Sequence, residues 1–204
     1  MPLVVAAVSV LVVVGGVGYF WYYGSPKYLE EGFRPVQPIP YSHKIHAGDN
    51  GIDCRYCHTS VEYTAQASIP PLQTCMNCHT MIKKDSDTIK AMTAMYVSGE
   101  PVKWVRVHNI PDYAYFNHSI HIAKGIGCSS CHGRIDQMER VEQVKELSMG
   151  WCLSCHRNPD QYIRPLDQIT NMAWQPGPNQ EEYARRMKVE RDINPPTDCE
   201  TCHR

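Results

Sequence analysis

The sequence predicts a mainly α-helical and irregular chain with little regular secondary structure, preceded by one N-terminal transmembrane helix. Three observations predict this: an apolar N-terminal segment, a shortage of aliphatic residues beyond it, and one cysteine–histidine motif repeated five times. Only 30 of the 180 residues after Gly24 are Leu, Ile, Val or Phe, too few for a core built from side chains alone. The 20 Lys and Arg nearly balance the 21 Asp and Glu, which argues against a nucleic-acid-binding protein.

Residues 1–24 predict a transmembrane anchor. Leu3–Gly18 contains Ser9 as its only polar residue, and five aromatic residues follow it directly. A helix over Leu3–Tyr23 is about 31 Å long, which matches the hydrocarbon core of a bilayer, and aromatic residues are typical of the membrane interface. A cleaved signal peptide is the alternative. The aromatic cluster and the absence of a basic segment before the apolar run favour an uncleaved anchor.

The remaining elements are short. Residues 25–42 contain four prolines and no helical periodicity, which predicts an extended, Pro-rich tether. Asp85–Ser98 has apolar residues at helical spacing, with Ser86 or Asp85 as the N-cap, and its methionines are expected to pack rather than to bind metal. Glu181–Asp192 predicts a highly charged helix with a solvated surface, and no long strand is indicated.

All ten cysteines fall into five C-x-x-C-H motifs. This is the attachment signature of c-type haem, in which two thiols add to the two vinyl groups of the porphyrin and the adjacent histidine binds the iron. Zinc ribbons and disulfide frameworks also contain C-x-x-C pairs, but neither explains a histidine after every pair. The thioether-forming cysteines are Cys54, Cys57, Cys75, Cys78, Cys128, Cys131, Cys152, Cys155, Cys199 and Cys202, and the proximal iron ligands are His58, His79, His132, His156 and His203.

Five covalently bound haem c groups account for the missing core. Each porphyrin is a large, flat, apolar body whose burial replaces that of Leu and Phe side chains. We therefore expect a multihaem cytochrome c that is largely unfolded without its cofactors, with some Lys and Arg residues serving haem propionates. Because c-type haem is attached on the outer side of the cell membrane, the haem domain is expected on the periplasmic face of a single-pass protein.

The haem domain, residues 43–204, contains an internal duplication. Each copy begins with H-x-x-H and continues with two haem motifs; the first module covers residues 43–80 and the second module residues 116–157. The first histidine precedes the first cysteine by 11 and 10 residues, and the successive motifs are 21 and 24 residues apart. A terminal haem motif at 199–203 follows the second module.

Five histidines remain outside the motifs, which is one distal iron ligand per haem. The two imidazoles of each H-x-x-H lie on one side of a helical turn, so they suit two adjacent haems rather than two faces of one haem. The fifth distal ligand is His108 or Met149, and a thioether ligand would raise the reduction potential of its haem. Packing is an alternative role for Met149. The distal histidines are His43, His46, His118, His121 and His108.

The H-x-x-H followed by closely spaced C-x-x-C-H motifs resembles the cytochrome c3/c7 type of multihaem protein. Pro38–Gly48, Trp104–Asp112 and Ser148–Cys152 more specifically resemble the pentahaem cytochrome c component of bacterial alternative complex III. This resemblance covers essentially the whole chain. It implies a quinol-oxidising respiratory or photosynthetic complex of the bacterial cell membrane. The implied partners are an iron–sulfur, molybdopterin-enzyme-like subunit, quinol-binding integral membrane subunits and a monohaem cytochrome c.

The resemblance implies an electron-transfer subunit that relays electrons through five haems to a periplasmic carrier or an oxidase. A stand-alone, membrane-anchored multihaem quinol dehydrogenase and the equivalent subunit of a quinone reductase complex are the alternatives. A multihaem enzyme that reduces a small substrate needs an open iron position, whereas this chain has enough candidate ligands to fill all five. We therefore expect a non-catalytic subunit of a quinol:electron-acceptor oxidoreductase.

Overall fold

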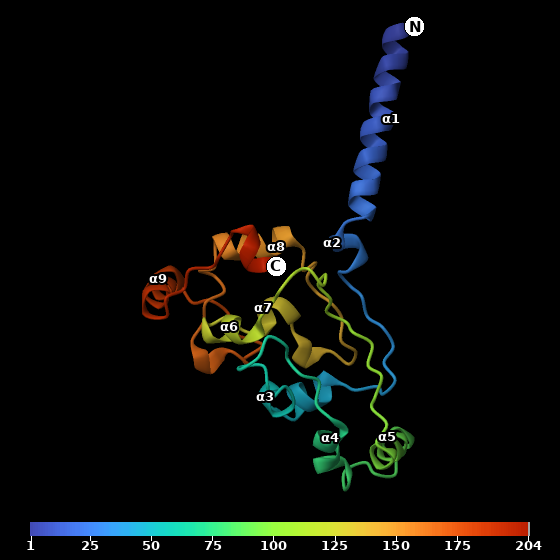
Figure 1. Ribbon diagram of the computed structural model, residues 1–204, viewed down its shortest axis with the longest axis vertical. Helices are drawn as coiled ribbons and strands as arrows, with labels where there is room; N and C mark the ends of the chain where they lie inside the picture. The colour runs from blue at the N-terminus through green and yellow to red at the C-terminus, as the bar shows by residue number, and fades with distance from the viewer. Residues whose placement is uncertain (204) are drawn as a thin grey trace.

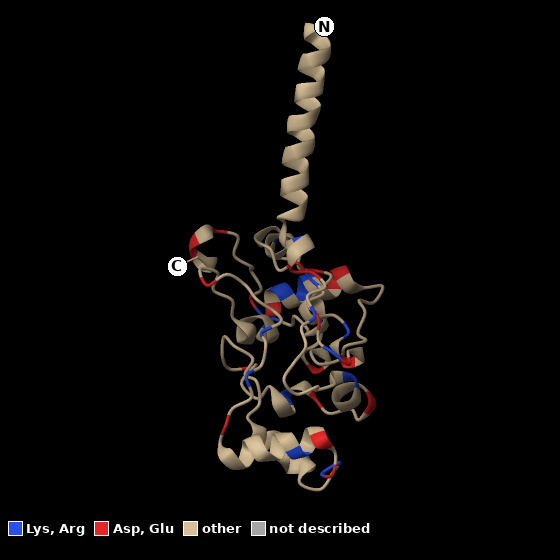
Figure 2. Ribbon diagram, turned by 90° about the vertical axis from the view of Figure 1, so that its right-hand side faces the viewer, with Lys and Arg blue, Asp and Glu red and all other residues tan. Residues whose placement is uncertain are grey.

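A long helix stands apart from the rest of the molecule in the computed structural model, which describes residues 1–203 (Figure 1). This helix, α1 (Pro2–Tyr23), has no buried residue and carries no Lys, Arg, Asp or Glu (Figure 2). Its length and composition make it the one candidate membrane span among the described residues, and a signal sequence would pass the same test. The sequence expectation of one long apolar helix is confirmed.

The segment that follows α1 is partly helical rather than extended throughout. Pro26 begins a single turn, α2 (Pro26–Leu29), because Ser25 before it is extended and proline suits the first helical position. Beyond α2 the segment is held along the body: the Gln37 side chain pairs with both the N–H and the C=O of Val105, at 2.9 and 2.8 Å. The predicted tether is therefore fixed to the haem domain by hydrogen bonds.

The body is built from short helices and loops, which confirms the predicted fold class. Within residues 1–203 the β structure is limited to a single antiparallel bridge between Ile126 and Ile163. The helices are α3 (Cys54–Cys57), α4 (Leu72–His79), α5 (Asp87–Ser98), α6 (His118–Ala123), α7 (Ser129–His132), α8 (Met149–Arg157), α9 (Gln180–Glu190) and α10 (Cys199–Cys202), with a π-helical turn at Lys44–Asp49 and 3₁₀ turns at Ile135–Gln137 and Leu166–Gln168.

Helix α5 forms where the apolar periodicity predicts it. The Ser86 side chain accepts a hydrogen bond from the Ile89 N–H and so caps the first turn, and Gly99 ends the helix in the left-handed region at φ 74°. Ile89 and Met92 of α5 are buried against Ile39 and Met76. The expectation that Ser86 is an N-cap and that Met92 packs rather than binds metal agrees with these contacts.

Helix α9 differs from its sequence expectation on one face. Its sequence is highly charged, but Ala184 and Met187 are buried against Ile163 and Ile193. The side chain of Gln180, at the first position of α9, donates to the Ile163 carbonyl at 2.8 Å. The prediction of a solvated surface is wrong for this face of α9, because a few small or apolar residues at helical spacing are enough to pack the helix against the body.

Candidate haem sites

The ten motif cysteines lie on short helical turns. Each C-x-x-C pair lies on one of the five helices α3, α4, α7, α8 and α10, with Cys128 as the N-cap of α7. Residues three apart on a helix share one side of it, so the two thiols of a pair can meet one porphyrin edge. All ten thiols are free, and within residues 1–203 no group of three His, Cys, Asp or Glu side chains converges as a metal-ion cluster.

Seven of the ten histidines hold Nδ1 against a backbone carbonyl oxygen, at 2.6–3.0 Å. When Nδ1–H donates to the carbonyl, Nε2 keeps a free lone pair and the ring orientation is fixed, as in metal-binding histidines generally. The contacts are His58–Ser68, His79–Ile82, His156–Pro196 and His203–Tyr113 among the motif histidines, and His46–Ser42, His118–Ala65 and His121–Asn117 among the others.

Three pairs of imidazoles have the spacing of two ligands on one iron. A metal–imidazole bond is about 2 Å long, so two rings on opposite sides of one iron have centres roughly 6 to 6.5 Å apart. In each of these pairs a C-x-x-C-H histidine faces a histidine of an H-x-x-H sequence. The ring centres are 6.1 Å apart for His46–His79, 6.1 Å for His121–His156 and 6.4 Å for His118–His132. The side chains therefore fit c-type haem.

Burial keeps several of these imidazoles neutral, which is the form that binds iron. It lowers the pKa of His43 to about 4, with a further contribution from His58. Burial likewise lowers the pKa of His132 to about 3. His43 also has a buried Nδ1 atom without a hydrogen-bond partner. His46 and His108 also lower the pKa of His43, so this side chain lies among several imidazoles, with His58 of the same module contributing most.

The two residues predicted as alternatives for the fifth distal ligand lie in different surroundings. His108 Nε2 is 3.3 Å from His132 Nδ1, and the two ring centres are 4.4 Å apart, too close for opposite sides of one iron. Met149 is the first residue of α8 and is 66% exposed, so its side chain is not packed into the protein. His203 contacts Tyr113 through Nδ1, which leaves its Nε2 free.

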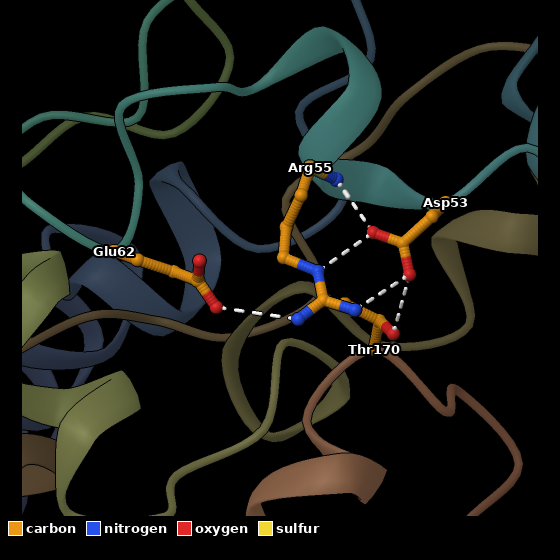
Figure 3. A network of polar contacts seen from close by, with 4 residues as sticks. All are labelled: Asp53, Arg55, Glu62 and Thr170. Atoms are coloured by element: carbon orange, nitrogen blue, oxygen red, sulfur yellow. Dashed lines mark hydrogen bonds and ion pairs between the residues drawn. The ribbon is translucent and has the colours of Figure 1, made fainter.

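The first haem motif of the first module lies beside the first haem motif of the second module. Before haem attachment the thiols of Cys54 and Cys128 perturb each other: the pKa of Cys54 is lowered and that of Cys128 is raised. Asp53, the N-cap of α3, accepts a hydrogen bond at 3.0 Å from Thr170 (Figure 3). The carbonyl of the neighbouring Ile169 accepts a hydrogen bond from the Cys128 N–H. The two attachment segments are thus joined by a polar network.

The same figure shows how the charge beside the first motif is neutralised. Arg55 forms ion pairs with Asp53 at 2.9 Å and Glu62 at 3.3 Å (Figure 3). The hydrogen bond from Arg55 is the main cause that holds the pKa of Asp53 at about 2. All three side chains are in contact with solvent. This arginine is therefore a solvated and compensated charge.

The five motifs follow one another along the body. The C-terminal helix α10 lies at the end of the body near α1, and α4 lies at the far end (Figure 1). Three motif cysteines have their pKa raised first by burial and next by a thiol of an adjacent motif. These neighbours are Cys202 for Cys152, Cys155 for Cys131 and Cys75 for Cys57. With the Cys54–Cys128 contact, the motifs run in the order 199–203, 152–156, 128–132, 54–58 and 75–79.

Arg164 is a charged residue at these motifs that the sequence did not predict. Arg164 is 3% exposed, and its guanidinium donates at 3.2 Å to the hydroxyls of Ser129 and Ser130, the two spacer residues of a haem motif. In the sequence it is a single arginine 34 positions after Ser130, with no local pattern to single it out. Only the folded chain brings it to the motif.

Two protein-family models match different parts of the chain. Residues 24–112 match the family model of the class III cytochrome C family, and residues 114–204 match that of cytochrome c7 and related cytochrome c. The boundary between the matches falls between the two modules. The chain is thus similar, in both halves, to multihaem c-type cytochromes, which carry electrons on covalently bound haem.

The chain is also similar to one curated protein over about half of its length. The chain is 36% identical over 97 residues to the "Menaquinone reductase, multiheme cytochrome c subunit" of Nitratidesulfovibrio vulgaris (strain Hildenborough). The match covers 47% of this chain and 45% of the relative, so it spans less than half of either protein. It relates the chain to a cytochrome subunit of a quinone-linked complex.

Proposed function

We propose that this chain is a membrane-anchored electron-transfer subunit with five covalently bound haems. The observation that carries the proposal is the set of imidazole pairs whose ring centres are 6.1 to 6.4 Å apart. When bound, each haem supplies a one-electron iron couple. The chain's own residues would hold each haem by two cysteine thioethers, and its histidines, with Met149 or His108 at the terminal haem, would supply the iron ligands.

The proposed ligand pairs follow the internal duplication. In each module the first histidine of H-x-x-H pairs with the first motif, and the second with the second motif. These pairs are His43–His58, His46–His79, His118–His132 and His121–His156. For the terminal haem, held by His203, the contact between His108 and His132 supports Met149 as the distal ligand, although the histidine count alone favours His108.

The order of the motifs supports a linear relay. Electrons would pass among five haems that follow the order 199–203, 152–156, 128–132, 54–58 and 75–79. If α1 spans the membrane, the terminal haem lies at the membrane side of the body, because α10 lies at the same end as α1 (Figure 1). The haem domain then faces the periplasm, where c-type haem is attached.

Two membrane complexes suit such a chain. The resemblance to the pentahaem cytochrome of alternative complex III favours a quinol-oxidising complex, with iron–sulfur/molybdopterin-enzyme-like, quinol-binding and monohaem cytochrome partners that pass electrons to a periplasmic carrier or an oxidase. The identity to a menaquinone reductase cytochrome supports the second candidate, the equivalent subunit of a quinone reductase complex. The two candidates differ in the direction of net electron flow.

The test is purification of the native complex from membranes. We expect haem-dependent peroxidase staining of this chain after denaturing electrophoresis, five haems per chain by pyridine haemochrome, and co-purifying quinone-site subunits. Reduction of the haems by added quinol indicates the quinol-oxidising complex. If the complex only transfers electrons from reduced haems to quinone, it is the quinone reductase complex. Haem that is lost on acid–acetone extraction, or a chain that purifies without partners, contradicts the proposal.

A further inference from the structure

Arg164 is a buried positive charge placed directly against one haem motif. Its Nη2 atom donates to Ser129 Oγ and Ser130 Oγ, each at 3.2 Å, and its Nη1 atom donates to the Asn171 carbonyl at 3.2 Å. Its guanidinium lies over the ring of Trp174, 4.4 Å from the ring centre. The charge is thus held between the two spacer residues of the motif and an aromatic ring.

This charge has no carboxylate partner among residues 1–203. Its Nε atom is buried without any hydrogen-bond partner. Buried charges are costly unless they are paired, so an uncompensated arginine in this position is unusual. Arg134, two residues after His132 in the same motif, shows the usual alternative: it is exposed and bonds to Asp136 at 2.7 Å.

The fold fixes the position of Arg164 from several sides. Its backbone N–H donates to the Gly125 carbonyl at 2.9 Å, next to the bridge between Ile126 and Ile163. A Cβ atom at Gly127 would overlap the guanidinium, so the space for this group depends on glycine at that position. The guanidinium is therefore held away from solvent, which would otherwise screen its charge.

We propose that Arg164 raises the reduction potential of the haem attached at Cys128 and Cys131. The inference rests on the proposed haem binding at this motif. Reduction lowers the charge of the iron by one, so a fixed positive charge in a buried, low-dielectric region favours the reduced state. The sign is the same if a haem propionate pairs with the guanidinium, because removal of the cation still makes the surroundings more negative. Arg164 acts through its charge and does not bind iron.

The test compares three variants of the full chain in detergent by spectroelectrochemical titration. We expect Arg164→Met to shift one of the five potentials to a lower value, Arg164→Lys to keep that potential close to wild type, and the matched control Arg134→Met to move it much less. The proposal is overturned if Arg164→Met leaves all five potentials unchanged, or if the Met and Lys variants shift the same potential equally.

Haem content separates this inference from the proposed function. Wild-type protein without five covalent haems refutes the proposed function, whereas five haems with an unmoved potential refute only the role of Arg164. Should Arg164→Met fail to retain five haems, Arg164→Gln removes the charge while keeping hydrogen-bond donors, and it should lower the same potential. If only the Lys variant holds five haems, the charge serves folding and the inference is wrong.

Discussion

The first and second modules repeat the same sequence motifs in different electrostatic surroundings. At the first motif of the first module, Arg55 is exposed and paired with Asp53 and Glu62. At the first motif of the second module, Arg164 is buried and has no carboxylate partner among residues 1–203. The haem motif is thus repeated, whereas the charges around it are not. If both motifs bind haem as proposed, this difference should give the two haems unequal reduction potentials.

The largest expected effect is loss of a buried haem from the second module. Replacement of Cys128 and Cys131 by Ala should prevent stable accumulation of the protein, because this site lies in the middle of the body and the unfilled space costs on the order of several kcal/mol. Replacement of Cys75 and Cys78, at the end far from α1, should leave a folded chain with four haems. Haem content per chain and thermal unfolding measure the difference. Equal stability of the two double variants would contradict the comparison.

The haem motifs are the part of the molecule that is easiest to recognise from the sequence alone. C-x-x-C-H and H-x-x-H are local patterns whose spacing follows from covalent chemistry and helical geometry, so they can be recognised without the fold. The contact of Arg164 with Ser129 and Ser130 joins residues 35 and 34 positions apart, and no local pattern encodes it. The buried face of α9 was missed for the same reason: its burial depends on Ile163, in a distant loop.

The second prediction concerns the distal ligand of the terminal haem. Met149→Ala should produce one high-spin haem, or one haem at a displaced potential, and abolish the near-infrared band of thioether ligation. His108→Ala should leave all five haems low-spin, because His108 Nε2 contacts His132 rather than an open position. Electron paramagnetic resonance and near-infrared spectra of the two variants measure this. A high-spin haem in His108→Ala and none in Met149→Ala would restore His108 as the ligand.

The third prediction is a loss of stability in acid, concentrated in the second module. In the second module burial lowers the pKa of His132 to about 3 and also lowers the pKa values of His118 and His121, and it lowers that of the adjoining His108 to about 4. In the first module it lowers the pKa of His43 to about 4. The unfolded chain takes up protons first, near pH 6.5, so the free energy of unfolding should fall as the pH drops from about 6.5 toward 4. Iron binding acts in the same direction, because the proton competes with the metal.

Chemical denaturation of the holoprotein at fixed ionic strength, with the haem spin state as a second signal, measures this dependence. His108→Gln removes the titrating imidazole that contacts His132 of the second module, and it should make the decline shallower. A free energy of unfolding that is constant or rises between pH 6.5 and 4 would show that these imidazoles are not held neutral in the folded chain.

The smallest expected effect is that of replacing Arg55, the exposed and paired arginine of the first module, which serves as the counterpart of Arg164 in the second module. Arg55→Met removes a charge that lies within a haem motif, but exposed ion pairs contribute only about 0 to 1 kcal/mol and are screened by salt. The haem at Cys54 and Cys57 should therefore keep its potential, within a much smaller shift than Arg164→Met causes at Cys128 and Cys131. The measurement is the same redox titration, repeated at low and high salt. If Arg55→Met moves its haem as far as Arg164→Met moves the other, burial and pairing do not decide the potential, and the two modules are electrostatically equivalent.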